Sequence, residues 1–165
     1  MSDIRIRKAK SADAELLLQL KREVSTILLT RLGHTLDQVA AWQDRFATPE
    51  YIKQHLRSPH ALYVVEDGGE VRGMAGLTLK DDGDDSIAYF GNLYVNSSGH
   101  SYGSRLMEYR LGVVEAFNVD YIKCHVHAGN ERARRFVEHY GFRASGSYNE
   151  TRLGSENIIY LKLVD

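Results

Sequence analysis

A turn of small residues between a strand-like run and a helical run constrains this chain more than any other feature of its sequence. The turn, from Asn96 to Ser104, reads Asn-Ser-Ser-Gly-His-Ser-Tyr-Gly-Ser and follows the apolar run Ile87 to Val95. Apolar residues from Leu106 to Phe117 then recur at a rough 3.6-residue spacing and predict a helix. Such a turn lets backbone N–H groups at the positive end of a helix approach an anion closely. The sequence therefore indicates either an anion-binding cradle or a plain loop with a helix cap.

The rest of the chain alternates between strand and helix patterns. These patterns predict elements in the order β-α-α-α-β-β-β-α-β-α-β-β, which is typical of one mixed α/β domain over residues 1–165. Strands are expected at residues 4–7, 61–65, 71–79, 87–95, 121–127, 142–148 and 157–164, and the last helix at residues 130–140.

The first half of the chain predicts three helices. In the first, Leu16, Leu17, Leu20 and Val24 recur at helical spacing and are expected to face the core, whereas the segment from Val24 to His34 has no clear period. Thr35 or Asp37 begins the second helix, and Thr48-Pro49-Glu50 opens the third.

Composition excludes several classes of protein. The 165 residues include 21 Lys and Arg against 22 Asp and Glu, so no global field would recruit nucleic acid or an anionic membrane. The single cysteine, Cys124, cannot form an internal disulfide and fits a reducing compartment. No apolar run reaches signal-peptide or membrane-span length. We expect a cytoplasmic protein that binds neither nucleic acid nor membrane.

Five groups of residues between 86 and 148 form an ordered series: Leu93-Tyr94-Val95, the turn from Gly99 to Gly103, Ile122 with Cys124 and Val126, Asn130-Glu131-Arg132-Ala133, and Gly141-Phe142. This series resembles the GNAT superfamily of acyl-coenzyme A-dependent N-acyltransferases. Leu93-Tyr94-Val95 is similar to the family's fourth strand, and the turn from Gly99 to Gly103 to its pyrophosphate loop. Ile122, Cys124 and Val126 match the fifth strand. The Asn-x-x-Ala helix and the Gly-Phe turn of the family correspond to Asn130-Glu131-Arg132-Ala133 and Gly141-Phe142.

The resemblance implies a fold, a cosubstrate and a reaction. The fold would be a mixed, mostly antiparallel sheet of about six to seven strands, with splayed fourth and fifth strands and flanking helices. Acetyl-CoA would donate an acetyl group to a primary amine by direct transfer in a ternary complex. The residues that would bind the cosubstrate are Leu93, Tyr94, Val95, Ser98, Gly99, His100, Ser101, Tyr102, Gly103, Ser104 and Asn130. Asn130 would also suit a helix N-cap.

The loop departs from the family pattern. The position of the usual Arg or Gln falls on Ser98, and the position of the central Gly falls on Ser101. Ser101 must then accept a conformation that Gly adopts more cheaply. An alternative alignment places His100 and Gly103 at these two positions but breaks the match in the helix.

The catalytic positions depart as well. Val137 stands where many family members have the Tyr that protonates the leaving thiolate, and Tyr89 stands where some have a catalytic Glu. Tyr140, one turn along the helix, is the substitute acid that we name, and Tyr148 and Tyr102 are further candidates. His127 is the candidate base, because histidine titrates in the right range. Cys124 could accept the acyl group covalently, although a buried thiol would be inert.

The segments that would bind the acceptor amine, namely the first helices and the last two strands, resemble the family least. We expect a small-molecule amine, with a protein amine as the alternative, and a possible homodimer through Ile158, Ile159 and Leu161. The acidic segment from Asp81 to Asp85 predicts a solvated turn, and no metal site is expected. A rival interpretation is a non-catalytic acyl-CoA-binding or regulatory module, since the usual catalytic side chains are missing.

Overall fold

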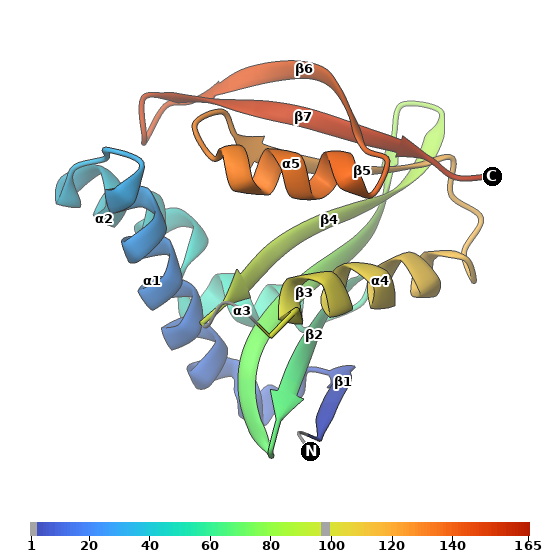
Figure 1. The fold of residues 1–165 in the computed structure, drawn as a ribbon, viewed down its shortest axis with the longest axis horizontal. Coiled ribbons are helices and arrows are strands. Elements are labelled where there is room, and N and C mark those ends of the chain that lie inside the picture. The colour runs from blue at the N-terminus through green and yellow to red at the C-terminus, as the bar shows by residue number, and fades with distance from the viewer. Residues whose placement is uncertain (1–2, 97–99) are drawn as a thin grey trace.

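Seven strands form one sheet in the order β1-β2-β3-β4-β5-β7-β6, with helices on both of its faces (Figure 1). This computed structural model describes residues 3–96 and 100–165. All neighbouring strands are antiparallel except β4 and β5, which are parallel. The predicted order of elements and the mixed, mostly antiparallel sheet are therefore confirmed.

The strands and helices have the following bounds. The strands are β1 (Ile4–Lys8), β2 (His60–Asp67), β3 (Glu70–Asp82), β4 (Asp85–Val95), β5 (Tyr121–His127), β6 (Arg143–Glu150) and β7 (Ser155–Leu163). A 3₁₀ turn (Ser11–Asp13) precedes the helices α1 (Ala14–Arg31), α2 (Leu36–Phe46), α3 (Pro49–His55), α4 (Tyr102–Val114) and α5 (Glu131–His139).

Side chains at the predicted caps fix where two of the helices begin. Thr35 Oγ1 accepts a hydrogen bond from the Gln38 N–H at 3.1 Å, and Thr48 Oγ1 accepts one from the Tyr51 N–H at 3.1 Å. Pro49 occupies the first turn of α3, where its missing N–H costs nothing.

Helix α1 differs from the sequence-based expectation in its length and in the face that it buries. The helix continues to Arg31, so most of the segment without a clear period is helical. Leu16 was expected in the core but is 45% exposed. Leu17 and Leu20 are buried as expected, and the buried face continues through Lys21, Ser25 and Leu29, so that Leu17, Lys21, Ser25 and Leu29 form a stripe at every fourth residue. Two polar residues on this stripe hid its period, because the pattern was sought among apolar residues alone.

The sheet divides the core into two layers. On one face, Phe90, Cys124 and Val126 pack with residues of α4 and α5. On the other face, Leu62, Val64 and Met74 pack with residues of α1 and α3. Each strand therefore presents alternate residues to the two layers, as a pleated sheet requires.

A β-bulge on β4 changes which residues face each layer. Gly91 pairs with Gly76 and Tyr94 pairs with Met74, so Asn92 and Leu93 together lie opposite the single residue between Gly76 and Met74. Asn92 adopts a left-handed conformation, with φ of +54°. A Cβ at Gly76 would lie 3.1 Å from the Gly91 carbonyl oxygen, so glycine permits the close approach of the two strands.

Candidate active site

Strands β4 and β5 pair over a short stretch and then separate. Their parallel pairing ends at Tyr89 and Lys123, and no ladder pair joins them beyond these residues. Figure 1 shows the two strands diverging from there. The separation leaves the backbone of β4 from Phe90 onward without a neighbour on the β5 side.

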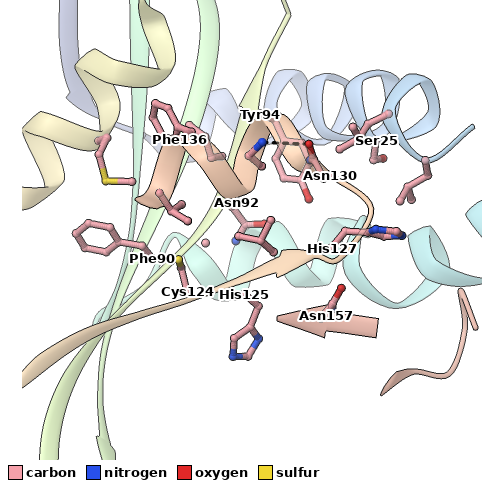
Figure 2. A pocket seen from close by; sticks show the side chains of 18 of the residues that line it. Ser25, Phe90, Asn92, Tyr94, Cys124, His125, His127, Asn130, Phe136 and Asn157 are labelled. Atoms are coloured by element: carbon pink, nitrogen blue, oxygen red, sulfur yellow. Dashed lines mark hydrogen bonds between the residues drawn. The ribbon is translucent and has the colours of Figure 1, made fainter. Parts of the chain in front are cut away.

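A cavity of about 250 Å³ occupies the gap between the two strands. Figure 2 shows side chains from both strands and from the surrounding helices around it. Ser25 and Trp42 line it from the α1 and α2 side, whereas Arg110 and Phe136 line it from the α4 and α5 side. The cavity is therefore accessible to groups on both faces of the sheet.

The first turn of α4 lies beyond the end of β4 and has the features of an anion site. Ser101 is its N-cap, with φ of +59°, so the expected strain at this serine is confirmed. The Arg105 N–H donates the first intrahelical hydrogen bond to the Ser101 carbonyl at 3.0 Å. The N–H groups of residues 102–104 therefore have no partners within the helix. No acidic residue lies in this turn to repel a phosphate.

The predicted cosubstrate residues fall into three groups. Leu93, Tyr94 and Asn130 line the cavity. Val95, His100, Ser101, Tyr102, Gly103 and Ser104 are described but do not line it. Ser98 and Gly99 lie outside the described residues. Of the predicted cosubstrate residues that the structure describes, those brought together at the cavity are thus Leu93 and Tyr94 of β4 and the cap of α5, Asn130.

Asn130 is a helix cap at the cavity wall. Its side-chain oxygen accepts a hydrogen bond from the Ala133 N–H at 3.2 Å. The N-cap interpretation is confirmed, and the amide nitrogen of the same side chain has no hydrogen-bond partner among residues 3–96 and 100–165.

His127 forms a pair with His34 at one side of the cavity. The two Nε2 atoms are 2.7 Å apart, and His127 Nδ1 accepts a hydrogen bond from the Gly129 N–H at 2.9 Å. His127 therefore carries its proton on Nε2 and donates it to His34. Burial, and after it the charge of His34, lowers the pKa of His127.

His125 belongs to a second polar chain on the same face of β5. Asn157 Nδ2 donates to the Tyr148 hydroxyl at 3.0 Å, and this hydroxyl is 3.0 Å from His125 Nδ1. His125 Nε2 is buried and has no partner among the described residues. Burial lowers the pKa of His125 to about 4, so this ring is neutral at physiological pH.

The other candidates for acid and nucleophile are placed less favourably. The Tyr140 hydroxyl donates to Glu108 at 3.2 Å, and Tyr140 is not among the residues that line the cavity. The Tyr102 hydroxyl donates to Asp67 at 2.5 Å. Burial raises the pKa of Cys124 to about 12, so its thiol is neither ionised nor a ready nucleophile.

Sequence reasoning missed three residues at the bulge: Lys21, Asn92 and Arg110. Lys21 Nζ donates to Asn92 Oδ1 at 2.7 Å, and Arg110 Nη1 donates to the Gly76 carbonyl at 3.0 Å. For Lys21 the available signal was the stripe at four-residue spacing in α1, on which Lys21 and Ser25 lie between Leu17 and Leu29.

A mixed sheet whose fourth and fifth strands part around a cavity, with a helix N-terminus beyond the end of the fourth, is the architecture of the GNAT acyltransferase fold. The sequence matches the model of the acetyltransferase (GNAT) family over residues 29–142, and the chain belongs to that family. No curated protein matches the sequence.

Solved structures show the same fold. PaiA N-acetyltransferase from Thermoplasma acidophilum, in complex with coenzyme A, superposes with a TM-score of 0.82 at 18% identity, over 98% of this chain and 99% of that one. Ribosomal-protein-alanine N-acetyltransferase from Brucella melitensis gives a TM-score of 0.74 at 19% identity, over 97% and 99%. Arabidopsis thaliana NAA60, in complex with acetyl-CoA, gives 0.73 at 14% identity, over 98% and 99%.

Two features are absent from the part of the chain that the structure describes. None of the helices in the described part of the chain is long and apolar enough to cross a membrane. Within residues 3–96 and 100–165, no group of three or more His, Cys, Asp or Glu side chains could hold a metal ion.

Proposed function

We propose that this protein transfers an acetyl group from acetyl-CoA to the primary amine of a small molecule, by direct transfer in a ternary complex. The observation that carries the proposal is the cavity between the parted strands, which is lined by side chains from both faces of the sheet. A cosubstrate on one side and an acceptor on the other could therefore meet inside it.

The residues present fit acetyl-CoA. The unpaired edge of β4 near Leu93 offers backbone groups to the amides of a pantetheine arm, in the manner of an added strand. The free N–H groups at the start of α4 offer a site for the pyrophosphate.

The proposed reaction exchanges one bond for another at the thioester carbon. The lone pair of the neutral amine forms the C–N bond, and the C–S bond breaks as its electron pair leaves with the thiolate. The amine nitrogen loses one proton and the thiolate gains one, so the products are an amide and a free thiol. Because Cys124 is protonated and buried, a covalent enzyme intermediate is not part of this route.

The lining of the cavity favours an acceptor that is not polycationic. None of the described residues that line it carries a carboxylate, and Arg110 is its one formally charged lining residue in that part of the chain. A polyamine or an aminoglycoside would need acidic partners for its additional ammonium groups. We therefore favour a small amine with neutral or anionic substituents and an apolar body that packs against Trp42.

The test is an acceptor screen read by thiol release, supported by calorimetry with acetyl-CoA. We expect binding of acetyl-CoA by the protein alone and thiol release only when an accepted amine is present. Mass spectrometry of the product should show the added acetyl group on the amine. Absence of both binding and turnover would rule out the proposal.

A non-catalytic acyl-CoA-binding module is the second candidate, because Val137 lines the cavity where many relatives have an acid. The same screen separates the two functions. A binding module would give calorimetric heat with acetyl-CoA but no thiol release with any amine.

A further inference from the structure

Two buried cations meet the β4 bulge from opposite faces of the sheet. Lys21 is 1% exposed, and its Nζ donates to Asn92 Oδ1 at 2.7 Å from the α1 side. Arg110 is also 1% exposed, and its Nη1 donates to the carbonyl oxygens of Gly76 at 3.0 Å and Gly91 at 3.5 Å from the α4 side. Both contacts are made at the bulge, where the ladder between β3 and β4 is interrupted.

Neither cation is neutralised by a carboxylate. The ion pairs among the described residues involve other side chains, and neither Lys21 nor Arg110 takes part in one. A buried charge without an ionic partner is costly, and a chain tolerates it only where other groups compensate. When Lys21 is protonated, no carboxylate of residues 3–96 and 100–165 therefore pairs with either positive charge at the bulge.

Aromatic rings and amide oxygens hold the two cations instead. Lys21 Nζ lies 3.9 Å from the centre of the Tyr51 ring, 5.5 Å from that of Tyr94 and 5.6 Å from that of Trp42. The Arg110 guanidinium lies 4.4 Å from the centre of the Phe90 ring. Such faces stabilise a cation without carrying a net charge of their own. This arrangement keeps each cation in place and preserves its field.

Arg110 itself lines the cavity, and Lys21 reaches the cavity wall through its hydrogen bond to Asn92. Gly91, Asn92, Leu93 and Arg110 all line the cavity, and Figure 2 shows Asn92 at its wall. Fixed positive charge in a site that excludes water stabilises negative charge far more than it would in bulk solvent.

We propose that Lys21 and Arg110 clamp the β4 bulge and stabilise the negative charge that develops on the thioester oxygen, and then on the departing sulfur, during acyl transfer. When the amine attacks, the carbonyl π pair moves to oxygen; when the C–S bond breaks, that charge passes to sulfur. The two cations act as positioning residues, Lys21 through Asn92 and Arg110 through the bulge carbonyls. This inference rests on the proposed function, and it supplies electrostatic stabilisation where Val137 replaces the usual acid.

Two substitutions separate the effect of the positive charge of Lys21 from the effect of its hydrogen bond to Asn92. Lys21→Met removes the charge and keeps most of the side-chain volume. Asn92→Asp keeps an acceptor for the Lys21 hydrogen bond, and aspartate tolerates the left-handed backbone, but its carboxylate cancels the positive charge. Lys53→Met, at an exposed position of α3, is the matched control for loss of a lysine.

The measurements are kcat, KM for the amine, and the dissociation constant of acetyl-CoA for each variant. We expect kcat to fall about 10- to 100-fold in both Lys21→Met and Asn92→Asp, while the acetyl-CoA dissociation constant changes by less than about 2-fold. Lys53→Met should match the wild type. A kcat at the wild-type level in Lys21→Met overturns the inference. A fall in kcat in Lys21→Met that Asn92→Asp does not share also overturns the inference. It would show that the hydrogen bond between Lys21 and Asn92 matters, but not the positive charge.

A second readout does not depend on activity. The side chains that face Lys21 are Trp42 of α2, Tyr51 and His55 of α3, and Asn92 and Tyr94 of β4. Because burial lowers the pKa of Lys21 to about 7, the kinetic measurements and the NMR titration are both made below that value, at about pH 6. NMR titration of the labelled lysine Nζ in the protein without ligand should show a charged Lys21 at this assay pH, with a higher pKa in Asn92→Asp. A Lys21 that is neutral at the assay pH refutes the electrostatic role, whatever the kinetics. If the wild-type protein binds no acetyl-CoA, the proposed function fails instead.

Discussion

His127 and His34 share a hydrogen bond of 2.7 Å between their Nε2 atoms, at the point where β5 meets the segment between α1 and α2. Since the Gly129 N–H occupies His127 Nδ1, neither nitrogen of His127 has a free lone pair in this arrangement. His127 therefore becomes a proton acceptor only when the contact with His34 opens or exchanges its proton.

Removal of His34 should make His127 a stronger base. In His34→Ala the Nε2 of His127 loses its partner, and the charge of His34 no longer lowers the pKa of His127. We expect the pKa of His127 to rise toward its ordinary value, as measured by NMR titration of the ring. If His127 is the general base, the acidic limb of the kcat/KM profile should move to higher pH with it.

The exposed His139 on α5 provides the control for this experiment. His139→Ala should leave the acidic limb of the kcat/KM profile at its wild-type pH. A limb that stays fixed in His34→Ala while the pKa of His127 moves would show that another group accepts the proton.

Lys21 should make the stability of the fold depend on pH. Burial lowers its pKa from 10.5 to about 7, so between these pH values the unfolded chain binds a proton that the folded chain has released. Rising pH therefore favours the folded state across this window, by up to about 1.4 kcal/mol per pH unit. Urea unfolding at several pH values should show this slope in the wild type and its loss in Lys21→Met. Equal slopes in the two proteins would contradict the prediction.

Much of the fold could be predicted from the sequence, because its elements are marked by local signals. Strand β5 begins and ends at the predicted residues, and the threonine caps of α2 and α3 are where the sequence places them. The parting of β4 from β5 followed from the family resemblance, since no residue pattern encodes which strands fail to pair.

The bulge and its cations could not be predicted in the same way. Asn92 has a left-handed backbone only because two residues of β4 face one of β3, and this register is a tertiary property. Lys21 is buried only because Tyr51, Tyr94 and Trp42 converge on it from three elements distant in sequence. Tyr140 shows that suitable spacing does not ensure a suitable position. Its place on the helix made it a candidate general acid, but its hydroxyl donates to Glu108 on α4.

Ser101→Gly should stabilise the protein. The left-handed backbone of Ser101 is strained for a residue with a Cβ, and its side chain makes no capping hydrogen bond that would be lost. We expect a gain of about 0.5–1 kcal/mol in the free energy of unfolding, after the greater flexibility of glycine in the unfolded chain is subtracted. Chemical denaturation measures it, and Ser101→Ala, which keeps the Cβ, should show no gain. Equal stability of the glycine and alanine variants would exclude backbone strain as the cause.

Asn130 has two candidate roles, and one pair of substitutions separates them. Asn130→Ala removes the acceptor for the Ala133 N–H and should cost about 1 kcal/mol of stability. Asn130→Asp keeps that acceptor and should retain the stability, but it replaces the amide NH₂ with a charged oxygen that cannot donate. If the amide binds the pantetheine arm, calorimetry should show weaker acetyl-CoA binding by Asn130→Asp with an unchanged unfolding midpoint. Wild-type affinity in Asn130→Asp would assign Asn130 to the helix cap alone, because the fold and the cap are intact in that variant and only the donor is missing.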